Sequence, residues 1–414
     1  MKKKVAILGM GPAGAMAAYR AGLKGHRVDL YDGNEKLGKK LFITGKGRCN
    51  LTTSGTIDEM MEKIPRNPFF LYSSFYQFSN LDLMDFFEKE SVPLKVERGN
   101  RIFPKSDKSS DINRALERAL DRVGVNFYYF SKVFNIDFHE DDQSFSLEIA
   151  RKDRKEIRSS YDAVILATGG MSYPSTGSTG SGYLLAKKFG HSILPTYPSL
   201  VPFVLKDPYI KSLEGLTLKN VCLHARIEES KEKFEEFGEM VFTHNGISGP
   251  IVLSLSSQLA SKDLSSLSLY LDFKPNLDDE TLRNRMIRER EENNNKDLSN
   301  VFSGFLPKAL VDIFLEKIFL DGKKKFHSFS AEERERAIQG LKHFDFHFLS
   351  LGSFHEAIIT RGGVNVDEVD PSTMESKLQK GLFFAGELLD VDGKTGGYNL
   401  TIAFSTGFVA GEHI

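Results

Sequence analysis

Three glycines near the start of the chain have the spacing of a turn that binds a dinucleotide. Gly9-x-Gly11-x-x-Gly14 follows the apolar run 5–8 and opens a segment with helical periodicity. In such a turn the first glycine permits a sharp bend, the second lets the backbone approach a pyrophosphate, and the third lets the helix pack on the strand. The free amides at the helix start face the phosphates. Asp32 ends the next apolar segment and is placed to accept ribose hydrogen bonds, so the turn suits FAD or NAD rather than NADP.

A second glycine cluster, at residues 38–52, combines cations with small and polar residues. Lys39, Lys40 and Arg48 lie there among several glycines. Their charges suit a pyrophosphate or a flavin carbonyl, and glycines let the backbone approach a flat ring. The alternative interpretation is a solvated basic loop.

A third cluster, at residues 386–400, separates an apolar run from the last helical segment. Asp390 is placed to hydrogen-bond a ribityl chain. The helix that begins after Gly396 and Gly397 has a positive N-terminus, which would stabilise the flavin edge that gains negative charge on reduction. A left-handed turn capped by Asn399 explains the glycines without a ligand, but it leaves Asp390 without a role.

Candidates for proton transfer and substrate binding are fewer and weaker. Tyr398 is a candidate proton donor at the flavin face, and His244 is a candidate general acid, although a lone histidine in a turn is more often structural. Arg101 suits an anionic substrate or the flavin edge, and equally a surface ion pair. Cys49 and Cys222 form no Cys-x4-Cys pair, which argues against a disulfide reductase; we expect both to be small buried side chains, and we expect no metal site.

The elements that must position these residues alternate between strand and helix. The apolar runs are typical of buried strands. The segment between residues 56 and 125 is typical of helices, and the pattern around residues 134–149 is typical of a hairpin. This order indicates an α/β fold. The composition changes near residue 190. We expect a β-rich stretch at 191–275, a helical one at 276–345, and a return of glycine-rich α/β sequence after that.

Overall composition narrows the class of protein. The chain has 414 residues, with 55 Lys and Arg against 56 Asp and Glu, a formal net charge of −1. Such a balance argues against binding of a polyanion through bulk charge. No apolar stretch approaches the roughly 20 residues that span a bilayer, so no membrane partner is expected. With two cysteines the chain suits a reducing compartment, and we expect a cytoplasmic location.

The glycine clusters and several further motifs resemble the YhiN/BaiN-like family of FAD-binding oxidoreductases, also described as aminoacetone-oxidase-like. The matching stretches span nearly the whole chain: residues 9–14, 38–52, 101–104, 167–180, 242–250 and 373–407. One departure is Ser181, where the family usually carries Asp. The resemblance implies a discontinuous, Rossmann-like FAD-binding domain of the two-dinucleotide type, with an inserted β-rich subdomain and a small helical subdomain. The implied ranges are 1–190 and 346–414 for the FAD domain, and 191–275 and 276–345 for the inserts.

The resemblance also implies which residues surround FAD. The pyrophosphate would lie near Gly11 and Gly14 with the cations of the second cluster, the ribose on Asp32, and the adenine against the Val133 backbone. The implied cofactor set is Gly9, Gly11, Pro12, Ala13, Gly14, Asp32, Gly33, Lys39, Lys40, Thr44, Gly45, Gly47, Arg48, Cys49, Asn50, Phe103, Val133, Ala167, Thr168, Gly169, Gly386, Asp390, Gly396, Gly397, Tyr398, Asn399 and Leu400.

Three functions follow from this resemblance. The first is an FAD-dependent oxidoreductase that passes hydride between the flavin and a small organic substrate. Because a second strand–glycine turn–helix unit is absent from the sequence, NADH or NADPH would visit the flavin transiently, or O₂ would reoxidise it. The second is an rRNA-modifying flavoenzyme that reduces uridine to dihydrouridine; it would need a basic surface near the flavin. The third is a flavin-binding protein without catalysis. The balanced charge favours the small substrate over nucleic acid, and the oligomeric state is left open.

Overall fold

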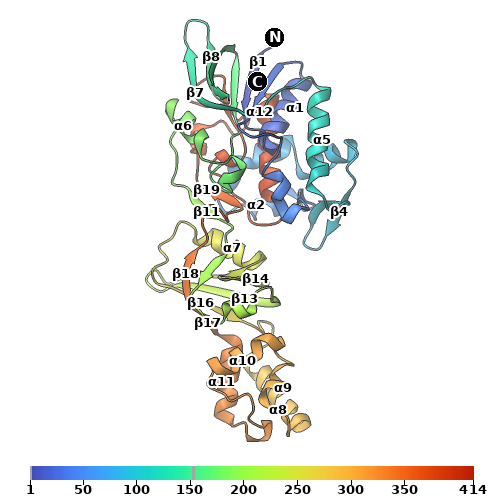
Figure 1. Cartoon of the computed structure of the whole chain (residues 1–414), viewed down its shortest axis with the longest axis vertical. Helices are drawn as coiled ribbons and strands as arrows, with labels where there is room; N and C mark the ends of the chain where they lie inside the picture. Colours follow the sequence, from blue (N-terminus) through green and yellow to red (C-terminus); the bar gives the residue numbers. More distant parts are fainter. Residues whose placement is uncertain (1, 152–153) are drawn as a thin grey trace. The chain divides into compact units, whose positions relative to one another are not determined.

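The chain, described here by a computed structural model covering residues 2–151 and 154–414, divides into two units (Figure 1). Unit 1 contains Met1–Ser199 and Phe354–Ile414, and unit 2 contains Leu200–Ser353. Each unit has a hydrophobic core of its own. Unit 2 is therefore an excursion from unit 1 in the middle of the chain.

A five-stranded parallel sheet forms the centre of unit 1. Its order is β20-β10-β1-β2-β6, and all four pairs of neighbours are parallel. The strands are β1 (Lys4–Leu8), β2 (Arg27–Tyr31), β6 (Asn126–Tyr128), β10 (Ala163–Leu166) and β20 (Leu382–Phe384). Every residue of β10 and β20 is buried, as expected for parallel strands with both faces covered. The apolar runs predicted as strands are these elements.

Two helices from opposite ends of the chain pack together in unit 1. They are α1 (Pro12–Leu23) and α12 (Tyr398–Glu412), which lie side by side in Figure 1. A side chain at Gly407 or Gly411 would overlap the carbonyl oxygen of Ala13 or Ala17, so these glycines permit the close approach. Through this contact the first and last segments of the chain form one layer.

Shorter elements surround this core. The other helices of unit 1 are α2 (Ile57–Met61), α3 (Tyr72–Gln77), α4 (Asn80–Lys89), α5 (Ser109–Arg122) and α6 (Ser181–Lys188). Its 3₁₀ helices are η1 (Leu41–Gly47), η2 (Pro68–Leu71), η3 (Pro174–Thr176), η6 (Val366–Glu368) and η7 (Gly386–Leu388). Its smaller sheets contain β3 (Thr52–Thr53), β4 (Leu94–Glu97) and β5 (Arg101–Pro104); β7 (Ser131–His139), β8 (Ser144–Arg151) and β9 (Arg154–Tyr161); and β11 (Tyr197–Ser199) with β19 (Ile359–Arg361). The hairpin expected around residues 134–149 is β7–β8, whereas β4 and β5 lie in a stretch predicted to be mostly helical.

Unit 2 is built on an antiparallel sheet of seven strands, in the order β17-β16-β13-β14-β15-β12-β18. The strands are β12 (Phe203–Leu205), β13 (Thr217–Ile227), β14 (Glu232–Thr243), β15 (Gly246–Ser248), β16 (Leu267–Asp272), β17 (Phe344–Phe346) and β18 (Phe348–Leu351). The helices are α7 (Pro250–Leu259), α8 (Asp279–Asn293), α9 (Leu298–Phe302), α10 (Lys308–Lys317) and α11 (Ala331–Lys342), with η4 (Ile210–Leu213) and η5 (Phe326–Ser328). Helices α8 to α11 gather at one end of this unit in Figure 1.

The structure places the junctions between the units after Ser199 and before Phe354. One hydrophobic core joins the sheet and the helices of unit 2. The sequence predicts domain limits at residues 190 and 345 and a division of the insert at residue 275. These limits stay predictions. Among the described residues, we find no helix that has both the length and the apolar character to cross a bilayer.

Candidate functional site

A cleft lies where the parallel strands end at their carboxyl edge. The segments that follow β1, β2, β10 and β20 all line it, which is where open α/β sheets bind ligands. Its lining residues are Gly9, Met10, Gly11, Pro12, Ala13, Asp32, Asn34, Lys39, Lys40, Leu41, Thr44, Ala167, Thr168, Gly169, Thr176, Gly177, Ser178, Ile358, Ile359, Glu387, Val391, Asn399, Leu400, Ile402 and Ala403.

The first glycine cluster forms the turn between β1 and α1. A Cβ at Gly9 would overlap the carbonyl oxygen of Ala167, and one at Gly14 would overlap that of Gly9. Gly11 differs, because its φ is −79° and a Cβ there would have nothing within 4 Å. The protein's own packing therefore requires glycine at 9 and 14 but not at 11. Gly11 also starts α1 with no side-chain cap, so bare backbone and free amides face the cleft. This cradle fits a pyrophosphate.

Asp32 is held in a fixed orientation at the end of β2. Its Oδ2 accepts a hydrogen bond from the Met10 amide (2.8 Å), and its Oδ1 accepts from the Asn34 amide (2.8 Å) and side-chain Nδ2 (2.9 Å). A carboxylate has four acceptor sites, so one remains for a ribose hydroxyl. Asp32 also lines an adjoining pocket with Gly33 and Val133, and the two cavities share Gly9, Asn34, Thr168 and Gly177. The two cavities are therefore continuous along the carboxyl edge of the sheet.

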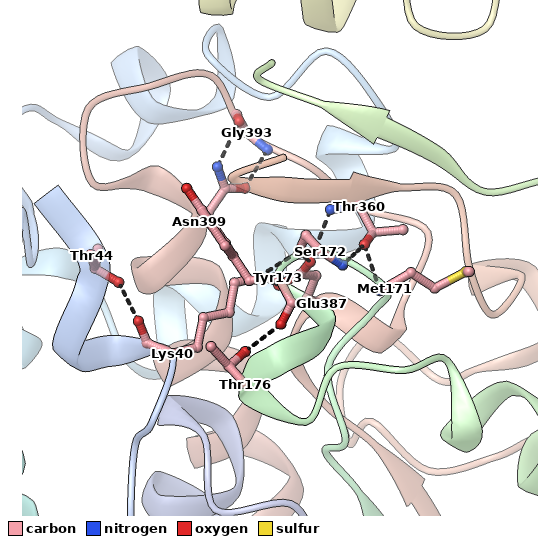
Figure 2. Close-up of polar contacts among 10 residues, drawn as sticks. All are labelled: Lys40, Thr44, Met171, Ser172, Tyr173, Thr176, Thr360, Glu387, Gly393 and Asn399. Carbon is pink, nitrogen blue, oxygen red and sulfur yellow. Dashed lines mark hydrogen bonds and ion pairs between the residues drawn. The ribbon is translucent and has the colours of Figure 1, made fainter. Parts of the chain in front are cut away.

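A polar network around Glu387 borders the cleft (Figure 2). Lys40 Nζ lies 2.6 Å from Glu387 Oε2 and 2.6 Å from Ser172 Oγ, and the Ser172 hydroxyl donates to Glu387. The Thr360 amide donates to Glu387 Oε1 (2.9 Å), while Thr360 Oγ1 accepts from the amides of Met171 (2.7 Å) and Ser172 (3.0 Å). Three separate segments thus fix one carboxylate at the cleft. Glu387 was not predicted as a site residue; its position three residues after the buried strand β20 was the available signal.

The third glycine cluster delivers the N-terminus of α12 to the same cleft. Gly396 and Gly397 have φ of 135° and 98°, and Gly397 starts α12 without a side-chain cap. Asn399 is fixed by the Gly393 amide and carbonyl (both 2.7 Å), and both Asn399 and Leu400 line the cleft. The positive end of a 15-residue helix therefore faces the cavity. Tyr398 is not among the lining residues, and its burial raises the pKa of its phenol.

Asp390 and Asp392 lie behind the cleft, on either side of the lining residue Val391. Asp390 is fully buried, with Arg66 Nε 2.5 Å from its Oδ1 and Asn67 Nδ2 donating to its Oδ2 (3.0 Å). Asp392 is also fully buried, and neither of its carboxylate oxygens has a hydrogen-bond partner in the structure. Burial raises the pKa of Asp392 to about 6. The structure thus places Glu387, rather than Asp390, at the cavity.

Most of the second glycine cluster points away from the cleft. Arg48 forms ion pairs with Glu97 (2.5 Å) and Asp107 (2.6 Å), and its guanidinium lies 4.2 Å from the centre of the Phe103 ring. Cys49 is completely buried, which raises the pKa of its thiol to about 12. Only Lys39, Lys40, Leu41 and Thr44 of this segment line the cavity. Gly45, Gly47, Arg48, Cys49, Asn50 and Phe103 support the loop from outside the lining, and Gly386 packs against Ala13.

The candidate catalytic residues lie on separate elements. His244 belongs to unit 2, where it is exposed and lies 3.0 Å from Glu214. Arg101 lies on β5 in unit 1, and its Nε donates to the Arg98 carbonyl (3.0 Å). Arg101 is not among the residues that line the cavity. Sequence spacing does not report where these side chains lie in space, because each belongs to a different element.

Comparison with known proteins identifies the family. The model of the HI0933-like protein Rossmann domain matches residues 3–413. The chain belongs to this family. As a member it is an FAD-binding protein of the oxidoreductase class with a Rossmann-like fold, which confirms the resemblance and the fold class expected from the sequence.

Individual relatives cover almost the whole chain. It is 30% identical over 409 residues to the ribosomal RNA dihydrouridine synthase of Escherichia coli (strain K12), covering 99% of this chain and 97% of the relative. It is 31% identical over 414 residues to the 3-dehydro-bile acid delta(4,6)-reductase of Clostridium scindens, covering 99% and 98%. A solved structure, the 3-ketosteroid delta1-dehydrogenase of Sterolibacterium denitrificans, matches with a TM-score of 0.50 at 11% identity, covering 100% of this chain and 99% of that one. At that identity the match shows the fold alone.

Proposed function

We propose that the protein is an FAD-dependent reductase that adds hydrogen across a carbon–carbon double bond conjugated to a carbonyl in a small, largely apolar substrate. The observation that carries the proposal is the Gly11 cradle. Glycine there has no packing role within the chain, yet it opens the uncapped N-terminus of α1 into the cleft. A bound pyrophosphate accounts for both features.

The rest of the cleft fits the remaining parts of FAD. Asp32 would take the ribose, and the pocket that contains Val133 would take the adenine. The network of Lys40 and Glu387 would bind the ribityl or pyrophosphate oxygens, because it presents both a cation and a carboxylate at the cavity. The N-terminus of α12 would face the flavin. FAD, when bound, supplies the hydride chemistry, and the chain supplies binding, orientation and the electrostatic field.

The names of the two relatives describe one kind of chemistry. Making dihydrouridine saturates a double bond that is conjugated to a carbonyl in the uracil ring, and a delta(4,6)-reductase of a 3-dehydro compound acts on double bonds in conjugation with a ketone. In both reactions negative charge develops on an oxygen. Hydrogen-bond donors or a positive helix terminus near that oxygen stabilise it. The N-terminus of α12 is suited to this task.

Apolar residues in the lining suit the flavin ring and a small apolar substrate stacked against it better than a ribonucleotide. They are Ile358, Ile359, Val391, Leu400 and Ile402. The even charge of the chain gives no general attraction to RNA. The ribosomal RNA function of two relatives makes uridine in rRNA the second candidate. The third candidate is a flavin-binding protein without catalysis. In the first two candidate functions, NADH or NADPH acts as a transient electron donor to the flavin.

The first test is the spectrum and reduction of the purified protein. We expect bound FAD, and we expect NADH or NADPH to bleach its absorbance under anaerobic conditions. A protein that binds no flavin when purified or reconstituted with FAD contradicts the proposal. If flavin is bound but neither NADH nor NADPH reduces it, the electron donor is a different compound. If no donor reduces the flavin, the protein binds flavin without catalysis.

A further inference from the structure

Cys222 lies on the polar face of the sheet in unit 2, not in its core. On β13 the core positions are Val221, Leu223, Ala225 and Ile227. Because side chains alternate along a strand, Cys222 points to the opposite face with its neighbour two residues on, His224. Its exposure is nevertheless only 7%. Cys222 is therefore buried, as expected from the sequence, on the face of the sheet opposite the apolar core.

Three side chains of different chemistry converge at this place. Cys222 Sγ, one ring nitrogen of His224 and a carboxylate oxygen of Glu235 all lie within 4.8 Å of one another. The ladder explains this convergence, since His224 on β13 is paired directly with Glu235 on β14. The His224 Nδ1 to Glu235 Oε2 distance is 3.3 Å. The thiol, imidazole and carboxylate come from two adjacent strands that hold them in register.

The neighbouring strand fixes the histidine ring. Tyr270 on β16 is paired with His224, and the two rings stack with centroids 4.6 Å apart and an angle of 6°. On its other side Tyr270 stacks with His343 at 3.7 Å. Stacking on Tyr270 therefore covers one face of the His224 ring and favours a fixed orientation of the imidazole. An oriented imidazole is a common property of metal-binding histidines.

Acidic side chains lie on both strands next to Cys222. In the ladder Cys222 is paired with Asp272 on β16, and Glu235 lies on β14 opposite His224. Asp272 is itself held by Lys342 (2.6 Å) and by the Lys274 amide (2.8 Å). Carboxylates at these positions add electrostatic attraction for a divalent cation.

We propose that Cys222, His224 and Glu235 form a site for a borderline divalent cation of the Zn²⁺ class. Thiolate and imidazole ligands favour zinc over Mg²⁺ and Ca²⁺, which prefer oxygen ligands only. Three protein ligands leave a fourth tetrahedral position for water, and Glu235, with 71% of its side chain exposed, gives access from solvent. A bound cation would connect β13 to β14 within unit 2. This site is independent of the proposed FAD chemistry.

The test uses the flavin-loaded protein stripped of metal by a chelator. Zinc affinity is measured by competition with a chromophoric chelator, and Co²⁺ is used as a spectroscopic probe at wavelengths beyond the absorbance of flavin. Cys222→Ser and Glu235→Gln remove single ligands with little change of volume. His244→Ala is the matched control, because His244 and Glu214 form a similar exposed pair in the same unit without a thiol.

We expect one zinc per chain and tetrahedral Co²⁺ bands, with affinity lowered on the order of 100-fold by Cys222→Ser, roughly 10-fold by Glu235→Gln, and unchanged by His244→Ala. An unaltered far-ultraviolet circular dichroism spectrum of each variant reports that both units are folded, and the flavin spectrum reports on unit 1 alone. The proposal is overturned if zinc binds Cys222→Ser as tightly as the unmodified protein, if His244→Ala weakens binding equally, or if Co²⁺ shows only octahedral bands.

Discussion

At the level of single residues, the three glycines of the turn have separate causes. Gly9 and Gly14 are enforced by neighbouring carbonyls, whereas Gly11 meets nothing within the chain. We therefore predict that Gly11→Ala leaves folding intact and weakens FAD binding roughly 10- to 100-fold, as expected when a methyl group intrudes on a filled site. Flavin retained per chain and the free energy of unfolding without flavin measure the two effects.

Gly304→Ala is the matched control for this substitution, because Gly304 is an exposed glycine of unit 2 with no positive φ. It should change neither quantity by much. If Gly11→Ala retains flavin like the control, the pyrophosphate does not lie on this turn.

Asp392 gives a second prediction, based on its buried and unpartnered carboxyl. Its pKa of about 6 in the folded chain exceeds the ordinary 3.8, so the folded state binds the proton more tightly than the unfolded state. Its contribution to stability is present below pH 4 and is lost as pH rises through 6. Asp392→Asn should remove this dependence. Relative to the unmodified protein, its free energy of unfolding should be about 2 kcal/mol higher at pH 7 than at pH 4. Urea titrations across this range measure the difference, and two parallel pH profiles would argue against a neutral Asp392.

The sequence predicted part of the site at this scale. Gly9, Gly11 and Asp32 could be predicted from the sequence because a local motif specifies their backbone geometry. The resemblance predicts that Arg48 contacts the cofactor, but its guanidinium is paired with Glu97 and Asp107, which are 49 and 59 residues away. Asp390 and Glu387 differ by three positions, and only the path of the chain after β20 decides which one reaches the cleft. No local pattern contains such information.

At the level of elements, the close packing of α1 on α12 holds both helix N-termini at the cleft. A Cβ at Gly411 would overlap the Ala17 carbonyl oxygen, far along the helix from the residues that line the cavity. Gly411→Ala should therefore destabilise unit 1 by about 1–3 kcal/mol, the usual effect of overpacking. Denaturant unfolding measures it, and an unchanged or raised midpoint would show that the helices can separate without loss.

The elements that the sequence predicted best are the buried parallel strands, because continuous apolar runs between turns have few other interpretations. Strands β4 and β5 were missed. Each has four residues and carries charged side chains such as Lys95, Glu97 and Arg101. Their pairing with each other stabilises them, and that is a contact of tertiary structure which periodicity does not report.

At the level of the whole molecule, the two hydrophobic cores share no residue. One core is drawn from unit 1 and the other from unit 2. We predict two thermal transitions, of which added FAD raises only one, because a ligand stabilises the unit whose native state it binds. Differential scanning calorimetry at several FAD concentrations measures this shift. A single transition, or an equal shift of both, would indicate that the units unfold together.

The discontinuous α/β fold was predictable because its glycine clusters lie at the two ends of the chain. The limits of the domains stay predictions, because they depend on how the strands pair. The strand β11 follows residue 190 but pairs with β19 of unit 1, and β17 and β18 overlap or follow residue 345 but join the sheet of unit 2. Strand composition does not reveal which sheet a strand joins.

The reoxidation of reduced flavin by a defined substrate tests the central claim most directly. The protein is reduced under anaerobic conditions and mixed with a conjugated cyclic enone, the saturated ketone of the same skeleton, or a uridine-containing RNA oligonucleotide. Absorbance of oxidised flavin is followed, and the product is analysed. We predict that the enone restores one equivalent of oxidised flavin and yields the saturated ketone, while the saturated ketone has no effect. If the enone leaves the flavin reduced while the RNA or only O₂ reoxidises it, the assignment to a small conjugated substrate is wrong.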